Sequence, residues 1–215
     1  MKLFIYEHCP FCVKARMIFG LKNIPVELVV MQNDDEATPQ KMVGQKIAPI
    51  LMKDDGSCMP ESLEIVNYVD KLDGEPLLTG KLNPAISDWL RQINGYLNKL
   101  TLPRIAGASF EEFATPEARN YFKEKKEATI GDFEELKRHA DGFIKNVNDD
   151  LRKLDKLIVK PNAVNGELSM DDIHLFPVLR SLTLIQGVEY PSRVADYRDN
   201  MAKQTQVNLL SSVAA

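Results

Sequence analysis

The sequence predicts an α/β domain over residues 1–72, a linker over residues 73–84 and an all-helical domain over residues 85–215. In the first third of the chain, short β-rich segments alternate with helical patterns. The next stretch, "DGEPLLTGKLNP", is rich in Gly and Pro and lacks sustained periodicity, which is typical of a linker. Beyond it every strong pattern is helical. The predicted fold class is therefore α/β plus all-α.

The chain is predicted to begin with a strand, a helix and a second strand. "KLFIY" at residues 2–6 indicates a buried strand, and "VELVV" at residues 26–30 indicates another. Between them apolar side chains recur at helical spacing: Phe11, Ala15, Ile18 and Leu21. This order implies a parallel strand pair with a right-handed crossover.

A hairpin and a helix are predicted to complete the α/β domain. "PILMK" and "SCM" flank Asp54, Asp55 and Gly56, and Asp-Gly between two short apolar runs is a strong hairpin signal. The helix follows in "ESLEIVNYVDKL" at residues 61–72. Its apolar face should consist of Ile65, Val66, Val69 and Leu72. The predicted order is thus βαβ followed by ββα.

Two long apolar stripes indicate packed helices after the linker. We interpret them as core positions and not as the lining of a cofactor site. The first stripe consists of Ile86, Trp89, Leu90, Ile93, Leu97 and Leu100, and the second of Phe133, Leu136, Ala140, Phe143, Val147, Leu151, Leu154 and Ile158.

The segment "LSMDDI" has the pattern of a helix start. Ser169 occupies the N-cap position and Asp172 the N3 position of a capping box, while Leu168 and Ile173 are placed for a hydrophobic staple. We expect the helix that begins here to include Pro177 as a kink.

The composition is that of an ordinary soluble globular protein. Hydrophobic residues make up 44% and charged residues 27% of the 215 residues, which argues against disordered and fibrous classes. The net charge of -4 is spread evenly, with eight basic and ten acidic residues in 1–72 and nineteen and twenty-one in the remainder. We therefore expect neither nucleic acid nor a membrane as a partner.

The beginning of the chain predicts the redox compartment. "MKLFIYEHCP" contains an apolar run too short for the core of a signal peptide, and no run approaches a membrane span. We expect a cytoplasmic protein. In that reducing compartment a CxxC pair is catalytic or metal-binding more often than a structural disulfide.

Cys9 and Cys12 form such a pair directly after the first predicted strand. Pro10 suits the first turn of a helix, so Cys9 should lie near the N-cap. There the free amides and the positive end of the helix dipole favour a thiolate and lower the pKa of Cys9. Cys12 lies one turn along, where it can attack a mixed disulfide and release the reduced product. We expect Cys12 to be the less exposed and less acidic thiol.

The cysteine pair is a weak candidate for a metal site. A structural zinc site commonly uses four Cys or His ligands, often as two paired knuckles. This chain offers one CxxC, the single further Cys58 and three scattered histidines. We expect no metal.

Two other segments allow both a structural and a binding interpretation. Pro49 either blunts a sheet edge or forms a cis turn that presents the preceding backbone to a ligand. Glu61 and Ser62 are either simple helix caps or a place where free amides and a hydroxyl hold a carboxylate. The local pattern does not choose between these alternatives.

These segments together resemble two related families. "CPFC" after "IY", "IAP" at residues 47–49 and "ES" at residues 61–62 resemble the glutathione-binding, thioredoxin-like domain of glutaredoxins and glutathione transferases. The helical region with "SMDD" resembles the second domain of glutathione transferases, so the resemblance covers nearly the entire chain. It implies a thioredoxin-like glutaredoxin domain followed by a glutathione-transferase-like helical domain.

The resemblance also implies roles for individual residues. Cys9 would be the nucleophile and Cys12 the resolving thiol. The backbone of Ala48, before a cis Pro49, would pair with the cysteinyl unit of glutathione. The γ-glutamyl end would be held by Glu61 and Ser62.

One departure from the family leaves part of the pocket open. Small glutaredoxins typically have "TVP" and a Gly-Gly pair, whereas this chain has "IAP" and no Gly-Gly. The glutathione pocket should therefore be closer to the transferase form. Lys41, Gln45 and Lys46 are candidates for binding the glycine carboxylate.

Several other residues could have either a structural or a functional role. Cys58 is expected to be a buried inert thiol and His8 a solvent-facing loop residue, although His8 could also tune the dithiol. Phe11 either shapes the lip of the site or begins the apolar face of its helix. For His139 and His174 we expect ordinary surface or interface positions.

The leading hypothesis is an enzyme, a glutathione-dependent thiol–disulfide oxidoreductase of the glutaredoxin type. Its partners would be glutathione, as a cosubstrate and not a permanently bound cofactor, and disulfide-containing or glutathionylated proteins. A transferase that conjugates glutathione to electrophiles and a scaffold that uses the helical half for docking are the alternatives. Transferase-like folds often dimerise, but the sequence identifies no interface, so a monomer is the working expectation.

Overall fold

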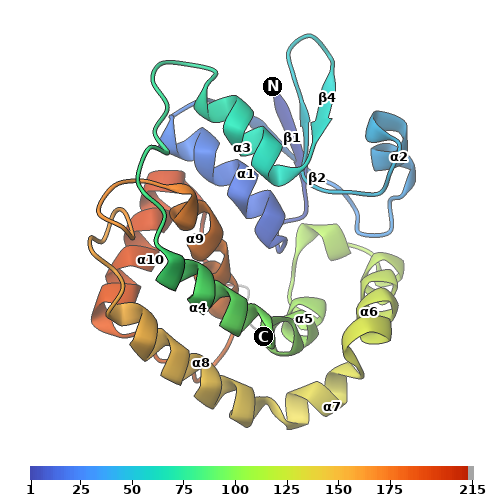
Figure 1. Cartoon of the computed structure of the whole chain (residues 1–215). Helices are drawn as coiled ribbons and strands as arrows, with labels where there is room; N and C mark the ends of the chain where they lie inside the picture. The colour runs from blue at the N-terminus through green and yellow to red at the C-terminus, as the bar shows by residue number, and fades with distance from the viewer. Residues whose placement is uncertain (213–215) are drawn as a thin grey trace.

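A four-stranded mixed sheet forms the first part of the chain in the computed structural model, which describes residues 1–212 (Figure 1). The strands are β1 (Lys2–Ile5), β2 (Glu27–Val30), β3 (Ile50–Met52) and β4 (Cys58–Pro60), in the spatial order β2-β1-β3-β4. β1 pairs with β2 in parallel, and β3 pairs antiparallel with both β1 and β4. The predicted parallel pair and hairpin are confirmed.

Helices α1 (Pro10–Leu21) and α3 (Ser62–Asp70) pack against each other beside the sheet, as Figure 1 shows. The prediction for α3 was wrong at one position. The helix ends at Asp70, so Leu72 lies beyond its C-cap and is 42% exposed. A further short helix, α2 (Ala37–Val43), was not predicted, because its sequence "ATPQKMV" contains Pro39 and offers no sustained apolar face.

The rest of the described chain is helical. Its elements are α4 (Pro84–Asn94), α5 (Leu97–Gly107), the 3-10 turn η1 (Glu111–Phe113), α6 (Pro116–Ile130), α7 (Phe133–Arg138), α8 (Ala140–Asp155), α9 (Met170–Leu182) and α10 (Ser192–Thr205). Each predicted apolar stripe is divided between two helices, the first between α4 and α5 and the second between α7 and α8, except that Ile158 lies beyond the end of α8. Most stripe residues are buried, as expected for core positions. The ranges 1–72, 73–84 and 85–215 remain our proposed domain boundaries.

The predicted helix start in "LSMDDI" is confirmed at α9. The backbone N–H of Ser169 donates to Oδ2 of Asp172 at 2.9 Å, and both bonds of the capping box are present. Asp172 also accepts a bond from the hydroxyl of Tyr197 in α10 at 2.8 Å. The cap therefore fixes the start of α9 and ties it to the neighbouring helix. Pro177 lies inside α9, as predicted.

The sheet part and the helical part share one hydrophobic core. α1 packs against α9 and α10 as well as against α3. The approach to α10 is so close that a Cβ added to Gly20 would lie 1.9 Å from the carbonyl oxygen of Thr205. Trp89 and Phe176 from the helical part belong to the same buried cluster as Leu3 and Ile65 from the sheet part. The position of α1 is therefore fixed from both sides.

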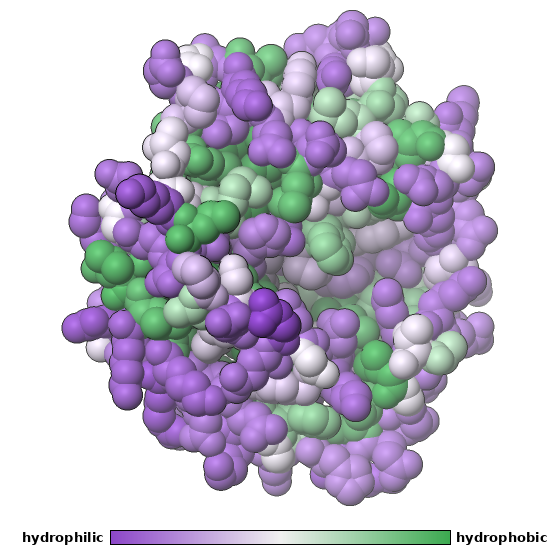
Figure 2. Space-filling view, viewed as in Figure 1, coloured by the Kyte–Doolittle hydropathy of each residue, from purple (hydrophilic) through white to green (hydrophobic). Residues whose placement is uncertain are grey.

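One face of the molecule is mostly hydrophilic, with hydrophobic residues in small groups, and Figure 2 shows it hollowed between the sheet part and the helices beside it. Among the helices in the described range, none has the length and apolar character needed to cross a membrane.

Candidate active site

Cys9 lies at the start of α1, where the sequence placed it. It is the N-cap residue, in an extended conformation with φ -74° and ψ 120°, and Pro10 follows as the first helical residue. The side chain of Cys9 is half-buried, whereas Cys12, one turn along, is fully buried. Only Cys9 is positioned to meet a substrate from solvent.

The surroundings of Cys9 favour its thiolate. They lower the pKa of Cys9 from its ordinary value of 9.0 to about 6. The largest contribution is a hydrogen bond from the Cys12 thiol. Burial of Cys9 raises its pKa and so opposes this bond. The charge of His8 and the backbone amides of Phe11 and Cys12 lower the pKa further. The amides are those left unpaired in the first turn of α1.

Cys12 has the opposite character. Burial raises the pKa of Cys12 well above its usual range, and its hydrogen bond to Cys9 raises it further. The backbone N–H of Tyr6 donates to Sγ of Cys12 at 3.4 Å. At neutral pH the pair therefore holds one thiolate, on Cys9, and one thiol, on Cys12, as the prediction required.

His8 is not the solvent-facing residue that we expected. It is 7% exposed, and its ring lies among the aromatic rings of Phe110, Phe113 and Phe122. Nδ1 of His8 lies 2.6 Å from Oε1 of Glu112 in η1. The prediction failed because this partner is 104 positions away in the sequence.

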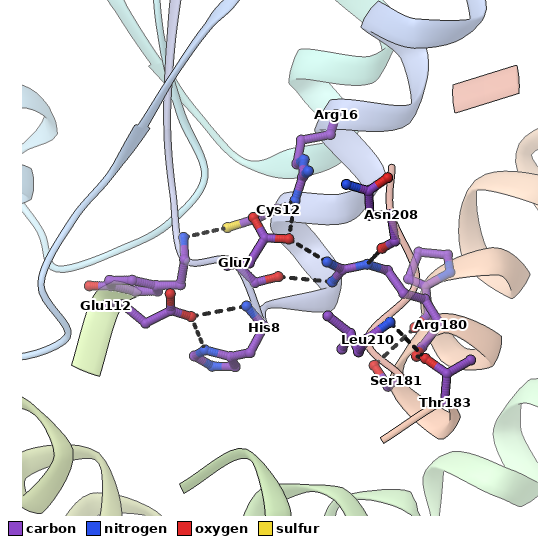
Figure 3. A network of polar contacts seen from close by, with 12 residues as sticks. Glu7, His8, Cys12, Arg16, Glu112, Arg180, Ser181, Thr183, Asn208 and Leu210 are labelled. Carbon is purple, nitrogen blue, oxygen red and sulfur yellow. Dashed lines mark hydrogen bonds and ion pairs between the residues drawn. The ribbon is translucent and has the colours of Figure 1, made fainter. Parts of the chain in front are cut away.

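The residue before His8 is also held by the helical part, as the close-up in Figure 3 shows. Arg180 of α9 is 1% exposed, and it donates to the backbone carbonyl of Glu7 at 2.8 Å and to the Glu7 carboxylate. Arg16 of α1 donates to both oxygens of the same carboxylate at 2.9 Å. Glu7 thus joins α1 to α9 immediately before the redox motif.

A cavity of about 380 Å³ lies at the contact of α1 with α10, and two hollows of about 620 Å³ lie over α8 and α10, but none of these is lined by a cysteine. The cavity at Cys9 measures about 290 Å³ and opens between the sheet part and α6, in the region of the recess in Figure 2. Its lining residues are Tyr6, His8, Cys9, Asn33, Lys46, Ile47, Ala48, Tyr121, Phe122, Lys125 and Lys126. Because these include three lysines and no carboxylate, the cavity suits an anion.

The four predicted glutathione-binding residues lie near one end of the sheet. The Ala48–Pro49 peptide bond is cis, and Ala48 lines the cavity. Glu61 and Ser62 follow β4 at the start of α3, and the pairing of Ile50 with Pro60 brings them to the sheet end where Pro49 lies. Glu61 has φ 71° and its side chain makes no capping bond, while Ser62 is 6% exposed. Of the four, only Ala48 belongs to the lining of the cavity.

Among the other candidate residues, only Cys58 departs from expectation. Cys58 is half-exposed, so the prediction of a buried thiol was wrong. Phe11 is 56% exposed, which favours the lip of the site over a core position, and Nζ of Lys14 lies 5.1 Å from its ring centroid. His174 belongs to α9 and faces α1, where its Nδ1 lies 3.0 Å from Nζ of Lys14. His139 is exposed where α7 ends and α8 begins.

Two residues around the site were missed by sequence reasoning. Arg180 interrupts the apolar run of α9 in "LFPVLRSL", and a charge on an otherwise buried helix could have been recognised as one needing a partner. Glu112 lies in "FEEF" between two aromatic residues, which is a much weaker signal. Neither pattern identifies the partner at the other end of the chain.

Comparison with known proteins places this geometry in a family. The family profile "Glutaredoxin 2, C terminal domain" matches residues 85–214, and "Glutathione S-transferase, N-terminal domain" matches residues 3–77. The chain belongs to the glutaredoxin 2 family. Glutaredoxin 2 of Escherichia coli (strain K12) is 71% identical over 214 residues, which cover the whole of both chains. The predicted enzyme class, a glutathione-dependent thiol–disulfide oxidoreductase, is confirmed by this membership.

Solved structures agree with the glutaredoxin 2 assignment. Glutaredoxin 2 from Salmonella typhimurium, crystallised in complex with glutathione, is 69% identical, with a TM-score of 0.98 over 100% of this chain and 98% of that one. Gtt2 from Saccharomyces cerevisiae is 20% identical, with a TM-score of 0.55 and 99% of each chain covered. The second likeness shows the fold alone. The predicted fold class, a thioredoxin-like domain followed by a glutathione-transferase-like helical domain, is confirmed.

Proposed function

We propose that this chain reduces glutathione mixed disulfides and protein disulfides, with Cys9 as the nucleophile and Cys12 as the resolving thiol. The observation that carries the proposal is the contrast between the two thiols. Cys9 is half-exposed beside a cavity lined by three lysines and has its pKa lowered, whereas Cys12 is buried and has its pKa raised. Cys9 can therefore attack a disulfide as a thiolate, while Cys12 remains a protonated thiol.

The first reaction needs Cys9 alone. The Cys9 thiolate attacks the glutathione sulfur of a mixed disulfide, the original S–S bond breaks, and the protein thiolate leaves and takes up a proton. A second glutathione, as its thiolate, then attacks the glutathione sulfur bound to Cys9. This step releases oxidised glutathione and restores the Cys9 thiolate. In sum, one free glutathione is consumed, the protein sulfur is reduced to a thiol, and the glutathione that was bound to the protein leaves as half of the oxidised glutathione.

Reduction of a protein disulfide needs both cysteines. Cys9 attacks one sulfur and forms a mixed disulfide with the protein, and Cys12 then loses its proton and attacks Cys9. The protein leaves as a dithiol and the enzyme holds a Cys9–Cys12 disulfide, which two glutathione molecules reduce. Once Cys9 is in a disulfide, it carries no negative charge to hold the Cys12 proton. The attack on Cys9 therefore becomes easier at the stage where it is needed.

We propose that glutathione is the cosubstrate and that no cofactor is permanently bound. The Salmonella typhimurium relative was crystallised with glutathione, which supports this. Ala48 and Pro49 would meet the cysteinyl unit, and Glu61 with Ser62 the γ-glutamyl end. Among the candidates for the glycine carboxylate, Lys46 lines the cavity at Cys9, while Lys41 and Gln45 do not. We therefore assign the glycine end to Lys46.

We also propose the substrates of this protein, its cellular compartment and its oligomeric state. Disulfide-containing and glutathionylated proteins would be the substrates, and the reducing cytoplasm would be the compartment, because glutathione is kept reduced there. The chain would act as a monomer, and no nucleic acid or membrane would take part.

The decisive experiment compares three single variants in two assays. Cys9→Ser should abolish transfer of electrons from glutathione to a small mixed disulfide and to a protein disulfide. Cys12→Ser should keep the first activity and lose the second. Cys58→Ser is the matched control, because this half-exposed thiol has no assigned role and both activities should remain. Turnover in Cys9→Ser, or equal loss of both activities in Cys12→Ser, would contradict the assigned roles.

Conjugation of glutathione to electrophiles is a second candidate, because the first part of the chain matches a transferase domain. A reactive aryl halide tested beside a disulfide substrate separates the two. We expect turnover of the disulfide only, since conjugation has no use for a resolving cysteine.

A further inference from the structure

Two neighbouring residues directly before Cys9 are bound to different elements of the helical part. Glu7 is held by Arg180 of α9, and His8 is held by Glu112 of η1 (Figure 3). The Arg180 contact includes the Glu7 backbone, so it fixes the path of the loop. The Glu112 contact includes the ring of His8, so it can also act on the charge of that ring.

The hydrogen bonds at Glu112 determine which nitrogen of His8 carries a proton. The backbone N–H of His8 donates to Oε1 of Glu112 at 3.0 Å, and Nδ1 of His8 lies 2.6 Å from the same oxygen. A carboxylate oxygen can accept both bonds but cannot donate. Nδ1 must therefore be the donor, which leaves two forms of the ring, the neutral Nδ1–H tautomer and the imidazolium.

The burial of Glu112 favours the imidazolium. Glu112 is 0% exposed, and its other oxygen, Oε2, has no hydrogen-bond partner among the residues that the structure describes. A carboxylate so far from water needs a cation beside it. Burial raises the pKa of Glu112, but the bonds and charge of His8 more than reverse this, so that the net pKa lies below its ordinary value. Arg180 is also within range of Glu112, but its hydrogen bonds go to Glu7 and Asn208.

We propose that Glu112 is a positioning residue of the reaction: by holding His8 as an imidazolium next to Cys9, it lets the helical domain stabilise the reactive thiolate of the other domain. A positive charge beside Cys9 favours the thiolate over the thiol. The ring is enclosed by aromatic side chains, so water screens this charge poorly. The inference deepens the proposed function, and it relies on that function only for Cys9 as the nucleophile.

Other charged groups around the loop have bonding partners different from Glu112. The titratable and charged groups near Cys9 and His8 are Tyr121, Lys125 and Lys126 from α6, Lys46 from the segment before β3, Tyr6 after β1, Cys12 and Lys14 from α1, and Glu7 with its partners Arg16 and Arg180. None of these other groups bonds Glu112 within residues 1–212, although its charge also acts on Cys12 and Arg180, so replacing Glu112 breaks one bonded pair, the pair with His8.

The test is titration of the Cys9 thiolate by its ultraviolet absorbance in Glu112→Gln, made in a Cys58→Ser background. Glutamine retains an oxygen that accepts both bonds from His8 but carries no charge. We expect the pKa of Cys9 to rise by about one unit, which would lower its thiolate fraction at pH 6 about fivefold from roughly one half. Glu111→Gln is the matched control, because this exposed neighbour on the same turn removes a carboxylate that does not touch His8.

A second variant separates electrostatics from structure. His8→Gln combined with Glu112→Gln should give the same Cys9 titration as Glu112→Gln alone. In both variants the side chains at positions 8 and 112 are uncharged. An unchanged Cys9 titration in Glu112→Gln, with or without loss of stability, would overturn the proposal and leave Glu112 a structural residue. A different titration in the double variant would also overturn it.

The charge of His8 can be read in the unmodified protein if the variants do not fold. The ¹⁵N chemical shifts of the two ring nitrogens distinguish an imidazolium from a neutral ring. We expect both ring nitrogens of His8 to carry a proton, because Nδ1 lies 2.6 Å from a carboxylate oxygen of Glu112, and a neutral ring would refute the proposal. Neither measurement uses turnover, so failure of the assigned reaction would be seen separately, in the activity of Cys9→Ser.

Discussion

The contrast between the two thiols makes a quantitative prediction about alkylation at two pH values. The perturbation is a shift from pH 7 to pH 5, and the comparison is with a free cysteine thiol of ordinary pKa. Iodoacetamide reacts with thiolates, so its rate reports the thiolate fraction of Cys9. A Cys58→Ser background removes the half-exposed third thiol, and Cys12 stays protonated because its pKa is raised.

The size of the effect follows from the lowered pKa. With a pKa of about 6 against 9.0, Cys9 has about 90 times the thiolate of the free thiol at pH 7 and about 900 times at pH 5. A thiolate of lower pKa is also a weaker nucleophile, by about 16- to 30-fold over three units. The net rate advantage is therefore only about 3- to 6-fold at pH 7 but about 30- to 55-fold at pH 5.

The assay is the second-order rate of alkylation of Cys9, with the modified residue identified by peptide mass. The advantage over free cysteine should grow about tenfold between pH 7 and pH 5, because the free thiol loses nearly all its thiolate while Cys9 keeps about one tenth. An advantage that is the same at both pH values would show that the pKa of Cys9 is not lowered. Cys9 would then not be the low-pKa nucleophile of the pair.

Three further predictions concern stability and the source of the thiolate. Gly20→Ala should destabilise the protein by at least about 2 kcal/mol in urea unfolding, because its Cβ would meet the backbone of α10, whereas Gly107→Ala, with nothing within 4 Å, should not. Ser169→Ala should cost about 1 kcal/mol by removing the N-cap hydroxyl of α9, with an unchanged Cys9 titration as the check that the effect is local. Cys12→Ala should raise the pKa of Cys9 more than Cys12→Ser, since serine keeps a hydroxyl that can donate to the thiolate; equal titrations would contradict the bond from Cys12.

Much of the fold follows from local patterns that the sequence displays directly. The parallel pair, the hairpin at Asp55 and Gly56, and the capping box at Ser169 depend on residues close together in the chain, and all were predicted. The errors lie where periodicity is short or absent. α2 has too few apolar positions, and Leu72 continues the pattern of a helix that has already ended.

The candidate site was predictable only in its reactive part. Cys9 and Cys12 could be assigned because the CxxC spacing and the helix start at Pro10 are local features, and these place the Cys12 thiol and the first-turn amides that lower the pKa of Cys9. The surroundings of His8 could not be assigned, because Glu112 and the phenylalanines that enclose the ring come from another part of the chain. A histidine beside a loop cysteine has the same local sequence whether it faces water or a buried carboxylate.

The common core of the two parts has a consequence for protein engineering. An excised first domain would expose the groove of α1 at Gly20, which is shaped to the backbone of α10, and would leave Glu7 without Arg180. The CxxC segment therefore depends on the helical part and cannot be moved to another protein with its surroundings intact. Transplanting it into another scaffold would carry the cysteines and His8 but leave behind Glu112 and Arg180, which hold His8 and Glu7 in place.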